Sequence, residues 1–144
     1  MGNGTSIGRV RGLGSAHGGE HHWMVQRFTA IANLLLASWL VVSFLLLPSL
    51  DFATLSEWLA RPLPSLAMAL LVVSTFWHAR LGLQVVIEDY VHGQANKFAA
   101  ITLLNLVTFG GAAAGLFFIL RIVMLSLSQH ATEALLKSAL GGAA

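Results

Sequence analysis

Residues 63–87 read LPSLAMALLVVSTFWHARLGLQVVI, an apolar stretch broken only by the ionisable side chains of His78 and Arg80. Two similar stretches flank it in the sequence, at 28–47 and 98–120, and neither contains a charge. Each reaches the roughly 20 residues that a helix needs to cross a hydrocarbon layer. The sequence therefore predicts an all-α integral membrane protein with three transmembrane helices, over about 28–48, 63–89 and 97–125.

The composition agrees with this class. The chain has 144 residues, of which 56% are hydrophobic and only 10% charged, and its mean hydropathy is +0.76. So few charges would not keep a globule of this size soluble. The absence of cysteine excludes disulfides, thiolate zinc sites and an iron–sulfur cluster held by this chain alone. A net charge of +2, scattered along the chain, does not suggest nucleic-acid binding.

Three segments are expected along the chain. Residues 1–20 are rich in glycine, lack the apolar core of a secretory signal, and are expected to be flexible. Residues 21–127 form the membrane domain, and its first connection carries a short interfacial helix around 55–60. Residues 128–144 are expected to form an amphipathic C-terminal tail.

The distribution of Lys and Arg predicts the orientation. The N-terminal side and the second loop together hold four such residues and the opposite side holds three, which favours a cytoplasmic N-terminus and a periplasmic C-terminus. The four are Arg9, Arg11, Arg27 and Lys97; the three are Arg61, Arg121 and Lys137. An initiator Met without a transit peptide favours a bacterial inner membrane.

His78 is the strongest functional signal, because an imidazole within a membrane span is costly and usually has a purpose. Three interpretations stay open: a histidine hydrogen-bonded to a neighbouring helix, an axial ligand of a haem, and a proton relay. Gly82 lies one turn further on the same face, where a missing side chain leaves room for a flat macrocycle or for helix packing. As a haem ligand, His78 needs a second ligand from another subunit, since the other histidines lie outside the spans.

The remaining polar residues have structural alternatives. Asp89 and Tyr90 form either a helix end at the water interface or a hydrogen-bonding pair for a quinone. Arg27 is either a boundary charge or a partner for an anion such as a haem propionate. Arg80 points about 200° away from His78 and is best interpreted as a helix–helix or intersubunit partner.

Small residues mark the third span. Gly111 and Gly115 have the GxxxG spacing that permits close approach of two helices. The pattern predicts an interface without saying which helix takes part.

Two motifs in this order resemble the smaller type of hydrophobic membrane anchor found in succinate dehydrogenase (respiratory complex II). The first is HWMVQRFTAI at 22–31, at the start of the first span. The second is His78-x3-Gly82-x6-Asp89-Tyr90 in the second span. The resemblance covers about residues 20–125.

The resemblance implies roles for these residues. His78 is expected to be one axial ligand of a haem b shared with a sister anchor subunit. Arg27 is expected to approach a haem propionate with the help of His21 or His22, between which the motif does not decide. Tyr90 is expected to hydrogen-bond ubiquinone, supported by Asp89.

The resemblance also implies partners. The chain would tether a flavoprotein subunit with FAD and an iron–sulfur subunit, beside a second anchor of the cytochrome b556 type, in the tricarboxylic acid cycle and respiratory electron transport. On its own it would not be catalytic. Two alternatives are the anchor of a fumarate reductase-type complex and a non-catalytic three-helix scaffold, assembly protein or small channel.

Overall fold

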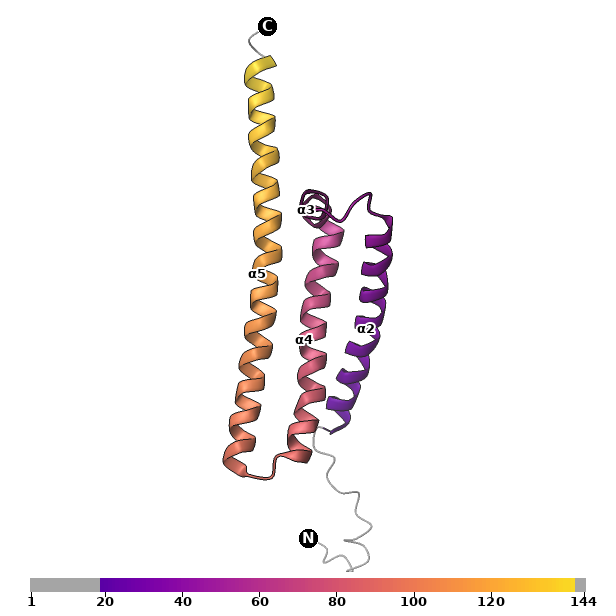
Figure 1. Cartoon of the computed structure of the whole chain (residues 1–144), viewed down its shortest axis with the longest axis vertical. Coiled ribbons are helices and arrows are strands. Elements are labelled where there is room, and N and C mark those ends of the chain that lie inside the picture. The colour runs from indigo at the N-terminus through magenta and orange to yellow at the C-terminus, as the bar shows by residue number, and fades with distance from the viewer. Residues whose placement is uncertain (1–18, 142–144) are drawn as a thin grey trace, which may run out of the picture.

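The computed structural model describes residues 19–141, and all four elements in that range are helices (Figure 1). They are α2 (Gly19–Leu46), α3 (Phe52–Ala60), α4 (Pro62–Tyr90) and α5 (Gln94–Gly141). Three of them, α2, α4 and α5, are long and apolar enough to cross a membrane. The prediction of an all-α protein with three transmembrane helices is confirmed.

The three long helices lie in a row, with α4 between α2 and α5 (Figure 1). α4 packs against both neighbours, whereas the backbones of α2 and α5 do not come into contact within the described residues. A row of this kind encloses almost no interior, and Trp58 and Leu81 are the only buried hydrophobic side chains in the described part of the chain. Because most large apolar side chains are exposed, the fold suits a surrounding of lipid and other membrane helices rather than water.

The short helix α3 is seen end-on in Figure 1, beside the start of α4 and next to α5. Its Trp58 stacks on Trp39 at 5.7 Å between ring centroids and meets the edge of Phe44 at 5.6 Å, which fastens α3 to the end of α2. Backbone contacts join α3 to α4 and α5 as well. Aromatic clusters of this type are common at the membrane–water boundary, where a short interfacial helix is expected.

Local chemistry explains where α3 and α4 begin. Asp51 caps α3, since its Oδ1 accepts a hydrogen bond of 2.7 Å from the backbone N–H of Thr54. That bond, with a second one donated by the Ser49 hydroxyl, lowers the pKa of Asp51 and keeps its carboxylate charged. Pro62 opens α4 at a position where a missing N–H has no consequence.

Two helix ends differ from the sequence prediction. The helix of the third span, α5, continues to Gly141 and does not end near residue 125. The described part of the predicted tail 128–144 therefore belongs to the same helix. Its residues are mostly good helix formers with no Pro, and nothing before Gly141 stops it. At 1.5 Å per residue, the 48 residues of α5 span about 72 Å, far more than the hydrocarbon layer.

The first span also begins earlier than predicted, at Gly19 instead of residue 28, so His21, His22 and Trp23 are helical. Glu20 in the first turn is favourable there, because its negative charge lies near the positive end of the helix dipole. Residues 1–18 and 142–144 lie outside the described part of the chain, and with them most of the predicted flexible segment 1–20.

Glycines permit the close approach of α4 and α5. A Cβ atom on Gly115 would lie 2.8 Å from Cγ1 of Val72, and one on Gly111 would overlap the ring of Phe76. Both neighbours belong to α4, so the GxxxG pair faces α4 of the same chain. Val72 is β-branched and has essentially one side-chain conformation in a helix, so it cannot move aside.

Replacing Gly115 by Ala is therefore expected to destabilise the α4–α5 packing by about 1–3 kcal/mol, the usual cost of overpacking. Gly110→Ala is the matched control, because a Cβ atom there meets nothing within 4 Å. SDS titration of the detergent-solubilised protein, followed by tryptophan fluorescence, measures both variants. Equal stability of Gly115→Ala and Gly110→Ala would contradict this description of the interface.

Candidate functional site

His78 lies in the middle of α4 and faces α2, where its half-buried ring meets Thr29. The distance from its Nδ1 to the Thr29 Oγ1 is 3.0 Å. The same Oγ1 lies 2.9 Å from the carbonyl oxygen of Val25 and 3.1 Å from that of Gln26. Thr29 thus joins the imidazole to the backbone of α2.

The other ring nitrogen of His78, Nε2, makes no hydrogen bond within the described residues. Every fully buried side-chain nitrogen or oxygen in the described residues has a hydrogen-bond partner. Because Nε2 has none, it is not fully buried. Nε2 therefore keeps some accessible surface at the outside of the row of helices. There it is accessible to a group that this chain does not supply.

Further contacts establish the register between α2 and α4. The Thr75 hydroxyl lies 3.4 Å from Oδ1 of Asn33, and a Cβ atom on Gly82 would lie 3.8 Å from the Gln26 side chain. Together with the His78 contact they describe two antiparallel helices, so the start of α2 lies beside the end of α4. Gly82 accordingly faces α2, and its Cβ contact would be an ordinary one.

This register brings most of the site residues predicted from sequence to one end of the molecule. The first turn of α2 carries His21 and His22, and the last turn of α4 carries Asp89 and Tyr90. Arg27 lies further along α2, next to the Gln26 that faces Gly82. His78 lies twelve residues before the end of α4, at a depth of about 18 Å.

Arg27 and the two histidines remain largely accessible. The Arg27 guanidinium lies over the ring of Trp23, at 5.4 Å from its centroid, and is exposed. His21 is exposed, whereas His22 is half-buried. A cation–π contact of this kind holds the guanidinium near the helix surface and leaves its donors available.

Asp89 and Tyr90 are exposed in the last turn of α4, and Tyr90 has 78% of its surface accessible. His92 and Lys97, which follow α4 in the sequence, bond back to its last turn. Nδ1 of His92 lies 3.1 Å from the Tyr90 carbonyl oxygen, and Lys97 donates a 2.8 Å hydrogen bond to the Glu88 carbonyl. A hollow of about 410 Å³ lies beside this turn, lined by His92, Gln94, Lys97, Phe98 and Ile101.

His92 and Lys97 were not singled out by sequence reasoning. His92 falls in the short connection after α4 and Lys97 in the first turn of α5, where charged side chains are ordinary, and no motif marks them. Only the short connection between the two spans hinted that they would lie close to the end of α4.

Arg80 belongs to a different environment. Its Nε donates a 2.6 Å hydrogen bond to Oδ1 of Asn105 on α5, and its guanidinium lies 5.4 Å from the centroid of the Trp77 ring. Arg80 therefore faces α5 whereas His78 faces α2, as their angular separation predicts. The interpretation of Arg80 as a helix–helix partner is confirmed.

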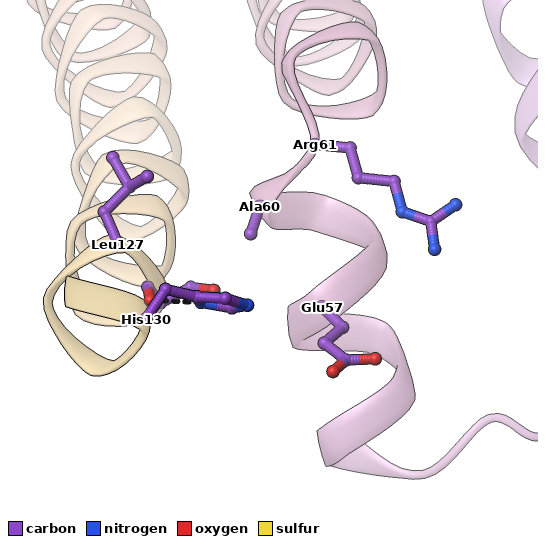
Figure 2. Close-up of a pocket in the computed structure, with 6 residues that line it drawn as sticks. Glu57, Ala60, Arg61, Leu127 and His130 are labelled. Atoms are coloured by element: carbon purple, nitrogen blue, oxygen red, sulfur yellow. Dashed lines mark hydrogen bonds between the residues drawn. The ribbon is translucent and has the colours of Figure 1, made fainter. Parts of the chain in front are cut away.

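A second hollow, of about 460 Å³, separates α3 from α5 at the opposite end of the molecule (Figure 2). His130 points from α5 across the gap toward α3, which carries Glu57 (Figure 2). Nδ1 of His130 lies 2.7 Å from the Ser126 carbonyl oxygen of the preceding turn. No sequence pattern links these residues, because they come from distant parts of the chain.

Within residues 19–141, no group of three or more His, Cys, Asp or Glu side chains is placed to hold a metal ion. A haem differs from such a site, because its porphyrin provides four ligands and a protein helix need supply only one. The haem ligand predicted at His78 therefore remains a prediction.

The fold and the site define a class of protein. Three helices long and apolar enough to span a membrane expose apolar surfaces on both sides of the row, and one of them carries a half-buried imidazole near its middle. These features are typical of a multi-pass membrane subunit that packs against other membrane components.

Sequence comparison identifies the family. A profile of the succinate dehydrogenase/fumarate reductase transmembrane subunits matches residues 1–117, and the chain belongs to this family. The resemblance inferred from the two motifs is thereby confirmed.

Three relatives illustrate the similarity, and each is named a succinate dehydrogenase hydrophobic membrane anchor subunit. The one from Rickettsia conorii is 35% identical over 118 residues, which cover 79% of this chain and 94% of the relative. The one from Rickettsia bellii is 38% identical over 87 residues (60% and 70%). The one from Paracoccus denitrificans is 33% identical over 93 residues (64% and 71%).

Proposed function

We propose that this chain is a membrane anchor of a succinate:ubiquinone oxidoreductase, that it shares a haem b with a sister anchor subunit, and that it contributes to the ubiquinone site. The observation that carries the proposal is the imidazole of His78. It lies near the middle of α4, contacts Thr29 through Nδ1, and has Nε2 without a partner in the described residues.

The residues present fit a haem. A low-spin b-type haem needs two protein ligands, and His78 would provide one of them through Nε2. The other must come from a sister subunit, because no further histidine lies within the spans near this depth. The haem supplies one-electron transfer near the quinone. The open sides of the helix row leave space for the sister helices that would enclose it.

Arg27, with His21 or His22, is proposed to bind the haem propionates. A guanidinium forms paired hydrogen bonds with a carboxylate, and Arg27 lies on α2 close to the level at which this helix contacts His78. Its cation–π contact with Trp23 restricts the side chain before any anion binds.

Tyr90 and Asp89 are proposed to serve ubiquinone. The phenol donates a hydrogen bond to a quinone carbonyl oxygen, which gains negative charge as electrons arrive. The neighbouring carboxylate relays the protons that accompany the two electrons. The high exposure of Tyr90 supports this role, since its ring is free to meet a ligand and a partner subunit.

The remaining cofactors belong to partners. Succinate oxidation requires FAD, and the electrons leave through iron–sulfur clusters, which this cysteine-free chain cannot bind. We place the flavoprotein and iron–sulfur subunits at the Tyr90 end of the molecule, on the cytoplasmic side of a bacterial inner membrane. The distribution of Lys and Arg supports this orientation. In a fumarate reductase-type complex the same subunits would carry electrons in the opposite direction, from quinol to fumarate.

The competing function is a scaffold without haem. It is favoured by the contact with Thr29, because that hydrogen bond by itself satisfies one ring nitrogen of His78. The two functions differ in whether Nε2 has a ligand.

The first prediction separates them. His78→Ala in the complete complex is expected to abolish or strongly alter the b-type absorption bands after dithionite reduction, because one axial ligand is lost. His130→Ala is the control, since this histidine lies at the α3 end of α5. A reduced spectrum of His78→Ala identical to that of the unmodified complex would refute haem ligation.

A second prediction concerns the quinone site. Tyr90→Phe is expected to lower succinate-driven ubiquinone reduction by about tenfold or more, because the phenol proton is lost. Reduction of a water-soluble dye by succinate should stay unchanged, since that reaction needs only the flavoprotein and iron–sulfur partners. Tyr90 is the only tyrosine of the chain, so no other phenol can substitute. Full quinone reductase activity in Tyr90→Phe would remove this residue from the site.

A further inference from the structure

We propose that Thr29 is a positioning residue for His78: its hydroxyl oxygen accepts the Nδ1 proton of the imidazole and thereby leaves the Nε2 lone pair for the haem iron. The inference rests on the proposed haem ligation. It means that a residue of α2 positions the proposed haem ligand on α4.

The donor and acceptor roles carry the inference. The Thr29 hydroxyl has one proton and two lone pairs, and three acceptors or donors surround its oxygen. Two of them, the carbonyl oxygens of Val25 and Gln26, can only accept, so the hydroxyl proton goes to one of these. The third neighbour, Nδ1 of His78, then donates its own proton to the Thr29 oxygen. A neutral imidazole protonated on Nδ1 has its lone pair on Nε2.

The opposite arrangement is less favourable. If the hydroxyl donated to Nδ1, the ring proton would be on Nε2, where the described residues offer no acceptor. An N–H group without a partner in an apolar environment costs free energy. That tautomer also has no lone pair with which to bind a metal.

Thr29 is itself held in place. Its hydroxyl bond to the Val25 carbonyl, one turn earlier, selects one of the two side-chain conformations of threonine in a helix. The Ser74 hydroxyl of α4 lies 3.3 Å from the Thr29 carbonyl oxygen and adds a second link between the helices at this point. The acceptor for the imidazole is therefore prepared before a haem binds.

Histidines that bind metals generally donate their other ring proton to an acceptor of this kind, and removal of the acceptor weakens metal binding by about 10- to 100-fold. In Thr29→Val the hydroxyl is replaced by a methyl group of similar size. We expect haem to dissociate more readily from the variant complex and the haem midpoint potential to change. Thr29→Ser should retain the properties of the unmodified complex.

The experiment compares haem per complex after detergent washing, the position of the reduced absorption bands, and the haem midpoint potential. Thr75→Val is the control, because it removes a hydroxyl from the same α2–α4 interface, where Thr75 contacts Asn33. If Thr29 only held the two helices together, Thr29→Val would behave like Thr75→Val. Both variants would then lose stability, and the haem spectrum and midpoint potential would be unaltered in each. That result would overturn the proposal.

Thr29→Ser and Thr29→Ala form a second comparison if the Val variant does not assemble. Both lack the methyl group and differ only in the hydroxyl. Equal haem retention and potential in these two variants would overturn the positioning role, whereas a loss confined to Thr29→Ala would support it. Haem retained in full by His78→Ala would instead overturn the proposed function, so the two failures are distinguishable.

Discussion

The fold depends on the need of every polar side chain within the hydrocarbon layer to find a partner. α4 carries the polar residues that matter most, and each reaches a different neighbour. His78 meets Thr29 on α2, and Arg80 meets Asn105 on α5. Single hydrogen bonds between membrane helices average only about 0.6 kcal/mol, so these contacts select the register and rotation of the helices more than they stabilise them. Because His78 contacts α2 and Arg80 contacts α5, α4 lies between these two helices.

The apolar surface sets the second requirement. Three helices in a row bury very little, and side chains along α2 and α5 are exposed over most of their length. Van der Waals packing through Gly111 and Gly115 holds α4 to α5, but no helix of the described residues covers the two open sides of α4. Membership in the family provides the physical explanation, since a transmembrane subunit of a larger complex can leave such surfaces for its partners.

Sequence was a good guide where one local property decides the outcome. The length of the apolar runs sufficed to predict three spans, and the angle between His78 and Arg80 predicted that they face different neighbours. Helix ends were harder, because α5 continues through a polar but helix-favouring segment that no Pro or Gly interrupts before Gly141. The partners Thr29 and Asn105 were not predictable, since they depend on how helices pair in space. The roles of His78, Arg27, Asp89 and Tyr90 remain predictions from resemblance.

The most direct test is purification of the tagged chain in mild detergent, with mass spectrometry of the proteins that accompany it and an absorption spectrum of the same sample. We expect a flavoprotein, an iron–sulfur protein and a second small membrane subunit, together with a b-type haem spectrum. A chain that purifies alone or with unrelated proteins, and without haem, would contradict its assignment as the anchor of a succinate-oxidising complex.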